Sequence, residues 1–261
     1  MICFFISLFL RKNTMKIYIS FLLFLLSSFS FSQSIIRPGA DFESKWLTDR
    51  NWKMNMTMRA NGNSRDLGVI HYAWIKDGVN YDIITDVILP GLPPKSWIDS
   101  LEISSKTLAP IRHKSTNMQR DILIEYAKSI SGYYLDKRKN VSTPFTYDLD
   151  SPVFDSGFYL FLLQLLPLET FSTPSEIGIF DFKPEGKQGA LKAFVTSVES
   201  GIYESPSGEK TEVWIVKSYD TIGRGEQTNS YISKSTRDIL KQETLDKEGN
   251  GMVLERIWEE K

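Results

Sequence analysis

The sequence predicts a mainly β fold, in which a curled antiparallel meander forms a barrel or half-barrel around one buried helix. Three observations predict it. Strand-like runs joined by tight turns recur from about residue 50 onward, polar and apolar residues alternate within them, and residues 154–166 are far more apolar than the rest. We expect about ten or eleven strands, connected mostly by hairpins.

Turn residues mark the hairpins most clearly. Asp77-Gly78 separates the β-rich residues 67–75 from residues 79–89, and glycine supplies the positive φ that a tight hairpin turn needs. Two later turns, at residues 205–210 and 246–251, are also rich in glycine and polar residues and lie between apolar runs. The remaining strand-like runs are residues 52–60, 97–104, 107–115, 121–130, 132–140 and 226–233.

Met54, Met56 and Met58 recur every second residue, so we expect them to share one face of a strand. Two stretches interrupt the strand pattern. Residues 89–96 contain three prolines and predict a loop or corner, and residues 140–157 predict a second connector that leads into the apolar stretch.

The apolar stretch predicts one buried helix near residues 154–166. Ser151 is suited to cap it, Pro152 to occupy its first position, and Pro167 to end it. A helix of about 13 residues spans about 20 Å, which is shorter than the hydrocarbon core of a bilayer. We therefore expect the curled sheet to enclose this helix, and we expect the mature chain to contain no transmembrane segment.

The amino-terminal residues predict export. Met15-Lys16 precedes an apolar run of ten residues, and small residues follow it, which is the pattern of a secretory signal peptide. We place cleavage between Ser32 and Gln33 and suggest Met15 as the true start. The domains expected are a signal peptide (1–32), an amino-terminal segment (33–50) and a single β domain (51–261).

Removing the leader leaves 229 of 261 residues and changes the net charge from −1 to −4, because the leader has three basic residues and no acids. A mildly acidic chain does not favour a nucleic-acid partner. The single cysteine, Cys3, lies in the leader, so the mature chain has no disulfide and no lipoprotein anchor. We expect a soluble periplasmic protein.

The sequence contains no strong catalytic signature. His71 and His113 are the only histidines, they lie on separate runs, and we interpret them as structural or surface residues. Asp148, Asp150 and Asp155 precede the apolar stretch and are interpreted as helix-capping acids. No nucleophile elbow, phosphate loop or metal-ligand spacing occurs, so we expect no cofactor, no metal and no enzymatic activity.

Aromatic residues supply the candidate ligand-binding side chains. We select Trp74, Tyr133, Phe158, Phe161 and Trp214, which lie on expected strands or on the helix. Aromatic residues of this kind fill the core of many β proteins. Alternatively, some of them line an apolar cavity between the helix and the concave sheet, as in barrels that hold one small ligand.

Three segments together resemble a known family. They are "TLAPIRHKS" from Thr107, "FDSGFYLFLLQLLPL" from Phe154 and "NSYISKSTRDILKQE" from Asn229. The chain is similar, over residues 51–258, to the exported bacterial family numbered three-one-zero-eight among domains of unknown function. The resemblance implies a curled sheet similar in outline to periplasmic lipoprotein carriers, and no catalytic residues. The leader resembles those of exported Bacteroidetes proteins.

Three functions follow as hypotheses. The first is a non-catalytic periplasmic protein that binds an apolar or amphipathic ligand, such as a lipid or acyl chain, in the curled sheet. The second is an interaction or scaffold protein in envelope assembly, which would meet a protein partner through a sheet edge or the proline loop. The third is a hydrolase that acts on glycans, with two carboxylates in an open cleft.

Overall fold

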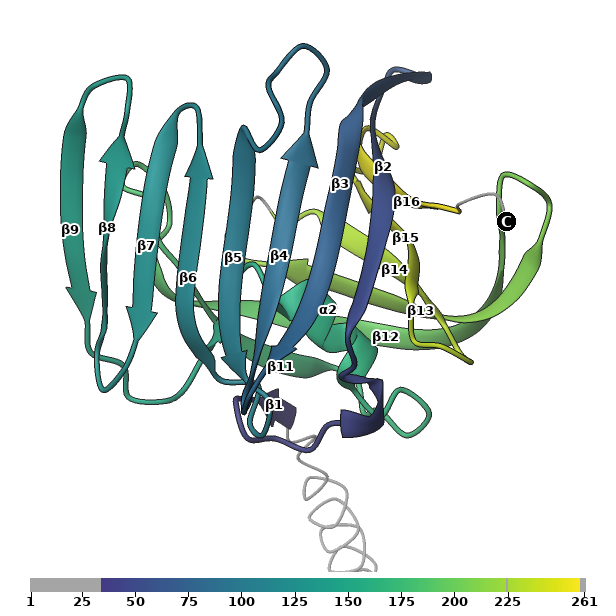
Figure 1. Cartoon of the computed structure of the whole chain (residues 1–261). Helices are drawn as coiled ribbons and strands as arrows, with labels where there is room; N and C mark the ends of the chain where they lie inside the picture. Colours follow the sequence, from purple (N-terminus) through teal and green to yellow (C-terminus); the bar gives the residue numbers. More distant parts are fainter. Residues whose placement is uncertain (1–33, 224, 259–261) are drawn as a thin grey trace, which may run out of the picture. The chain divides into compact units, whose positions relative to one another are not determined.

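The computed structural model describes residues 34–223 and 225–258, and the expected signal peptide lies outside them. The described residues form one 16-stranded sheet (Figure 1). Its strands are β1 (Ser34–Ile36), β2 (Arg50–Ala60), β3 (Asn63–Asp77), β4 (Asn80–Ile88), β5 (Trp97–Ser104), β6 (Pro110–Asn117), β7 (Arg120–Tyr126), β8 (Ile130–Asp136), β9 (Val141–Tyr147), β10 (Phe154–Asp155), β11 (Ser175–Asp181), β12 (Gly189–Glu204), β13 (Lys210–Asp220), β14 (Gln227–Ser233), β15 (Ile239–Leu245) and β16 (Gly251–Ile257). Its helical segments are η1 (Ser44–Trp46), α2 (Tyr159–Leu162) and η2 (Leu163–Leu165).

The sheet consists of two antiparallel meanders. One runs in order from β2 to β9, the other from β11 to β16, and the last strand, β16, pairs antiparallel with β2 to join them. The second meander passes behind the first, and α2 lies between the two (Figure 1). The predicted curled antiparallel fold is therefore confirmed. The strands do not follow one another in chain order throughout, because β16 pairs with β2 in the middle of the sheet and β1 and β10 pair parallel with β11.

The expected hairpins form where the turn residues lie. Gly78 has a φ of 58° in the turn between β3 and β4, and the later turns connect β12 to β13 and β15 to β16. Met54 and Met56 are buried on one face of β2, whereas Met58, near the end of the strand, is exposed. Beside Met56 the register with β3 shifts at Gly68, where a Cβ would lie 2.1 Å from the carbonyl oxygen of Ile88. Only glycine fits this bulge.

Two further segments are strands: one lies in the stretch expected to be a connector, and the other was assigned to no element. Residues 141–147 form β9 and residues 175–181 form β11, which accounts for part of the difference between the expected strand number and the 16 observed. These strands are not hydrogen-bonded to each other, but aromatic rings connect them. Phe145 of β9 stacks on Phe182 at 3.8 Å between ring centroids, and Tyr147 meets Phe180 edge-on at 5.5 Å. Aromatic packing therefore holds the β9 edge against the second meander.

The predicted helix at residues 154–166 is much shorter than expected. Phe154–Asp155 is a strand that pairs with β11, and α2 begins at Tyr159, makes one turn and continues as η2. Phe158 precedes the helix without a side-chain cap, and no acid lies in its first turn, so the capping role assigned to Ser151 and the nearby aspartates is wrong. Within the described residues, none of the helices has the length and apolarity needed to cross a bilayer.

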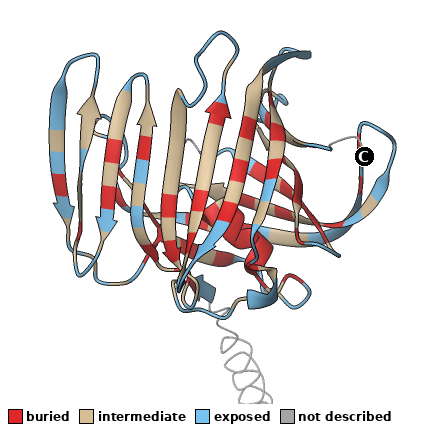
Figure 2. Cartoon of the chain, viewed as in Figure 1, coloured by how far each residue is buried: buried red, intermediate tan, exposed pale blue. Residues whose placement is uncertain are grey.

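The main core surrounds α2 and η2. Leu162, Leu163 and Leu165 are at most 1% exposed and pack with buried residues of both meanders, which explains why the stretch is so apolar. Figure 2 shows that buried residues gather on the helix and on the nearby strands, whereas β8 and β9 are mostly intermediate or exposed. The main core is thus packed around the helix, and a second, smaller cluster of buried residues joins β7–β9 to residues 180–182.

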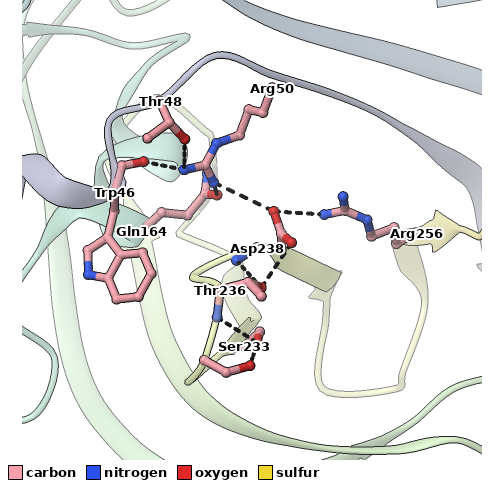
Figure 3. A network of polar contacts seen from close by, with 9 residues as sticks. Trp46, Thr48, Arg50, Gln164, Ser233, Thr236, Asp238 and Arg256 are labelled. Atoms are coloured by element: carbon pink, nitrogen blue, oxygen red, sulfur yellow. Dashed lines mark hydrogen bonds and ion pairs between the residues drawn. The ribbon is translucent and has the colours of Figure 1, made fainter.

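A polar network ties the amino-terminal segment to the seam between β16 and β2 (Figure 3). The Arg50 guanidinium donates to the Gln164 side chain of η2 at 3.3 Å and to the Trp46 carbonyl oxygen. Asp238 lies between two arginines, 3.6 Å from Arg50 and 3.1 Å from Arg256. The segment before β2 therefore belongs to the same compact unit as the strands.

Candidate functional site

A cleft of about 580 Å³ lies between the two meanders beside α2. Side chains from the first meander, the β10–α2 segment and the ends of β11 and β13 line it. The lining residues with apolar or aromatic side chains are Ile122, Ile124, Tyr134, Tyr159, Leu160, Phe182 and Ile222. Those with charged or titratable side chains are Asp99, His113, Arg120, Asp181, Lys183, Asp220 and Glu226. We call this space the cleft.

One buried carboxylate supports the floor of the cleft. Asp155, which is 0% exposed, lies 2.9 Å from His113 Nδ1 through Oδ2, and the same oxygen accepts a 2.6 Å hydrogen bond from Tyr126. Its Oδ1 accepts the backbone N–H of Gly157 at 2.7 Å. The three donors come from β6, β7 and the β10–α2 turn, so Asp155 fixes the turn that starts the helix against the first meander.

The electrostatics of this cluster favour the charged pair. Burial opposes both charges, but the coulombic attraction and the hydrogen bond between Asp155 and His113 outweigh it. The pKa of His113 is therefore raised above its ordinary value and the pKa of Asp155 is lowered. Burial, together with the negative charge of Asp155, raises the pKa of Tyr126 well above its usual range, so Tyr126 stays a hydrogen-bond donor.

Two further acids face the cleft, and each accepts hydrogen bonds from its neighbours. Burial, with a smaller contribution from Asp155, raises the pKa of Asp181, whose Oδ1 accepts a 3.1 Å hydrogen bond from Ser156. Asp220 accepts a 2.6 Å hydrogen bond from Tyr159 through Oδ2, and its Oδ1 accepts the backbone N–H groups of Ile222 and Gly223. The polar groups of the cleft are thus mostly held in place by their neighbours.

This arrangement can bind a ligand with apolar and polar parts, and His113 can exchange a proton with it. His113 has 14% of its side chain exposed and lines the cleft, and among the described residues its Nε2 has no hydrogen-bond partner. No group of three or more His, Cys, Asp or Glu side chains in residues 34–223 and 225–258 is placed to hold a metal ion.

The aromatic residues selected from the sequence lie mostly in the core. Trp74 and Phe161 meet edge-on at 6.1 Å, and both are buried, as is Phe158. Trp214 packs against the same core from β13, where Lys234 lies over its ring. Tyr133 is 37% exposed, and it lies on the face of β8 opposite to that of Tyr134. The structure brings four of the five together, and none of the five lines the cleft.

The sequence analysis did not select the residues that line the cleft or the carboxylate beneath them. His71 and His113 were treated alike, but His71 lies opposite Asp86 in the β3–β4 pair, whereas His113 forms the buried ion pair. Asp155 is the one charged residue in an otherwise apolar stretch that ends at Leu166. A charge in such a stretch must be paired when it is buried, and this was the available signal.

Residues 53–252 match the family model described as "Protein of unknown function (DUF3108)". The chain belongs to this family. The resemblance inferred from the three sequence segments is therefore confirmed, while the likeness of the DUF3108 fold to lipoprotein carriers stays a prediction. No curated protein matches the chain.

Among solved structures, this DUF3108 protein is similar to a beta-barrel-like protein of the domain of unknown function DUF1849 from Brucella abortus. The TM-score is 0.48 and the sequence identity is 10%, and the match covers 81% of this chain and 96% of the other.

Proposed function

We propose that this DUF3108 protein binds one amphipathic ligand in the cleft and does not act on it chemically. The observation that carries the proposal is the cleft itself, whose volume of about 580 Å³ lies within the range of about 300–1,000 Å³ typical of small-molecule sites. It combines an apolar wall, formed by residues such as Ile122 and Leu160, with charged groups, so a ligand with both an apolar and a polar part matches it best.

A lipid or a single acyl chain is the ligand class that we favour. Each methylene buried against the apolar wall contributes about 0.8 kcal/mol, so a short length of chain is enough for useful affinity. The polar groups of the cleft are already fixed, because Asp155 and Asp220 each accept three hydrogen bonds. A preformed site of this kind binds without a large ordering cost.

Two considerations support a binding protein over an enzyme. Asp155 is fully enclosed and neutralised by His113, which suits a structural ion pair better than a general base. The hydroxyl group closest in sequence to this pair belongs to Ser156, and it donates a hydrogen bond to Asp181 rather than to His113. It is therefore not paired with His113 as a catalytic nucleophile would be. The signal peptide expected at residues 1–32 favours export. We therefore propose that the protein works in the periplasm as a soluble, unanchored carrier.

Native mass spectrometry of protein purified from its own cell envelope tests the proposal. We expect a mass excess that organic extraction removes and that matches a lipid or fatty acid. Leu160→Arg, which places a charge in the cleft, should abolish the excess. Leu92→Arg, an exposed site in the proline loop, should retain it. A clean apo mass, together with no binding of added amphiphiles, contradicts the proposal.

A second candidate is a glycan-acting hydrolase, and one specific observation favours it. The pKa values of two carboxyl groups near the cleft are shifted apart, since that of Asp155 is lowered and that of Asp181 is raised, and His113 lies beside Asp155. Opposed pKa shifts of this kind mark acid and base pairs in enzymes. Release of new reducing ends from cell-wall glycans, lost in Asp181→Asn, would favour the hydrolase and contradict the binding protein.

A further inference from the structure

The cleft continues into a second hollow. A hollow of about 410 Å³ shares Tyr134 and Lys183 with the cleft and extends to the β8–β9 turn and to residues 183–185. We call the cleft and this hollow together the groove. The groove therefore runs along the concave face of the first meander, from α2 to the edge strand β9.

The strand register arranges the groove in rows of different polarity. On β7, Arg120 and Ile122 lie on the same face, because side chains alternate along a strand. Arg120 pairs with Asp136 of β8, and Ile122 pairs with Tyr134. An apolar row thus lies next to a charged row, and the charged row is at the hairpin end of the strands.

Three cations along the groove form no ion pair with the residues that the structure describes. Arg120 donates to the Ser115 hydroxyl at 2.9 Å, and among the described residues neither Arg138 nor Lys183 has an ion-pair partner. The acids at this end are already engaged. Asp136 accepts the backbone N–H groups of Arg138 and Lys139 and faces the Lys139 ammonium, which also pairs with Glu185.

Two acids at the other end of the groove are held by hydrogen bonds. Asp220 accepts hydrogen bonds from Tyr159 and from two backbone N–H groups, and Asp181 accepts one from Ser156 while burial raises its pKa. Arg120 and Arg138, by contrast, lie at the hairpin end of the groove, next to the apolar row.

We propose that the ligand is an amphipathic anion, a single apolar chain with a carboxylate or phosphate head group. The chain lies over Ile122 and Tyr134, and the head group meets Lys183, Arg138 and Arg120. This inference rests on the proposed function and deepens it, because it assigns the sign of the head-group charge and the residues that recognise it.

Ligands with one chain and different head groups test the inference. Isothermal titration of the purified protein with dodecanoate, dodecyl phosphate, dodecanol and dodecyltrimethylammonium separates the head group from the chain. We expect the two anions to bind at least about tenfold more tightly than the alcohol, and the cation to bind most weakly. Raising the salt concentration should weaken only the anions, because salt screens exposed charges. A preference for dodecyl phosphate over dodecanoate would indicate a phosphate head group.

Charge-reversal variants test which residues bind the head group. The double variant Arg138→Glu/Lys183→Glu should lose about tenfold in affinity for dodecanoate and leave dodecanol unchanged. Lys247→Glu, in the exposed turn between β15 and β16, is the matched control and should change neither. Equal binding of all four ligands overturns the inference but leaves the proposed function standing. Binding of none of them overturns the proposed function.

Discussion

The two sides of α2 differ sharply although they are built from neighbouring residues. Phe161 faces a packed aromatic cluster, where Trp52, Tyr72 and Trp74 surround its ring at centroid distances of 5.2–6.1 Å. Leu160, the preceding residue, lines the open cleft. A single helical turn therefore divides the interior of the sheet into a filled half and an open half. Apolar residues lie on both sides, so an apolar residue by itself does not reveal which side is open.

The largest loss of stability should come from a polar substitution in the filled half. Phe161→Asn places an amide in the aromatic cluster and leaves a cavity, and we expect a loss of about 5 kcal/mol in the free energy of unfolding. Leu160→Asn on the open side should cost about 1–2 kcal/mol, because water already reaches this position. Urea denaturation of both variants measures the difference. Equal losses would show that the helix does not separate the two halves.

A smaller loss should follow from removing the charge that fixes the helix. Asp155→Asn keeps the shape of the side chain but leaves His113 and Tyr126 without their charged acceptor, and we expect a loss of about 3 kcal/mol. Asp148→Asn, in the exposed loop before β10, is the control and should change the free energy by less than about 0.5 kcal/mol. A comparable change in both variants would argue against a buried ion pair.

The sequence predicted the fold well where local signals decide it. Alternating residues and turns such as Asp77-Gly78 are read from neighbours in the chain, and these strands formed as expected. The failures depend on distant partners. Residues 175–181 become a strand that pairs with β12 on one side and with β1 and β10 on the other, and residues 154–155 leave the helix as Asp155 pairs with His113 on β6.

The candidate site was much harder to predict, for a related reason. An aromatic residue that fills a core and one that lines a cavity have the same local pattern, so Trp74 and Phe161 could not be distinguished from Tyr134 or Phe182. Family membership could be recognised because the three segments that begin at Thr107, Phe154 and Asn229 together resemble the family. The acids that line the cleft, by contrast, include Asp99 on β5, Asp181 on β11 and Asp220 on β13, and they gather only when the two meanders fold over the helix.

The pH dependence of stability should sharpen the contrast between the two halves. The lowered pKa of Asp155 gives a contribution present above its unfolded pKa of about 3.9 and lost as pH falls through the folded value. The raised pKa of His113 gives a contribution present below its unfolded pKa of about 6.5 and lost as pH rises through the folded value.

The free-energy difference between wild type and Asp155→Asn should therefore be greatest between about pH 4 and 6.5 and should fall on either side. Urea denaturation from pH 3 to 9 measures it. Phe161→Leu, in the filled half, removes no titrating group, so its difference from wild type should stay constant. A difference for Asp155→Asn that keeps rising above pH 8 would contradict a raised His113 pKa.

The smallest effect should come from the hydroxyl group that links the helix to the far wall of the cleft. Tyr159→Phe removes a 2.6 Å hydrogen bond to Asp220 while keeping the ring, and we expect a loss of about 1.5 kcal/mol, because the acceptor is a carboxylate. Tyr147→Phe removes a 3.0 Å hydrogen bond to exposed Gln188 and should cost less than about 0.5 kcal/mol. Burial and the charge of Asp220 raise the pKa of Tyr159, so the hydroxyl stays a donor and the loss should not change between neutral and mildly alkaline pH. If Tyr159→Phe costs no more than Tyr147→Phe, the hydrogen bond does not position the helix, and the wall of the cleft formed by Asp220 and Ile222 is held by other contacts, such as the backbone N–H groups that Asp220 accepts.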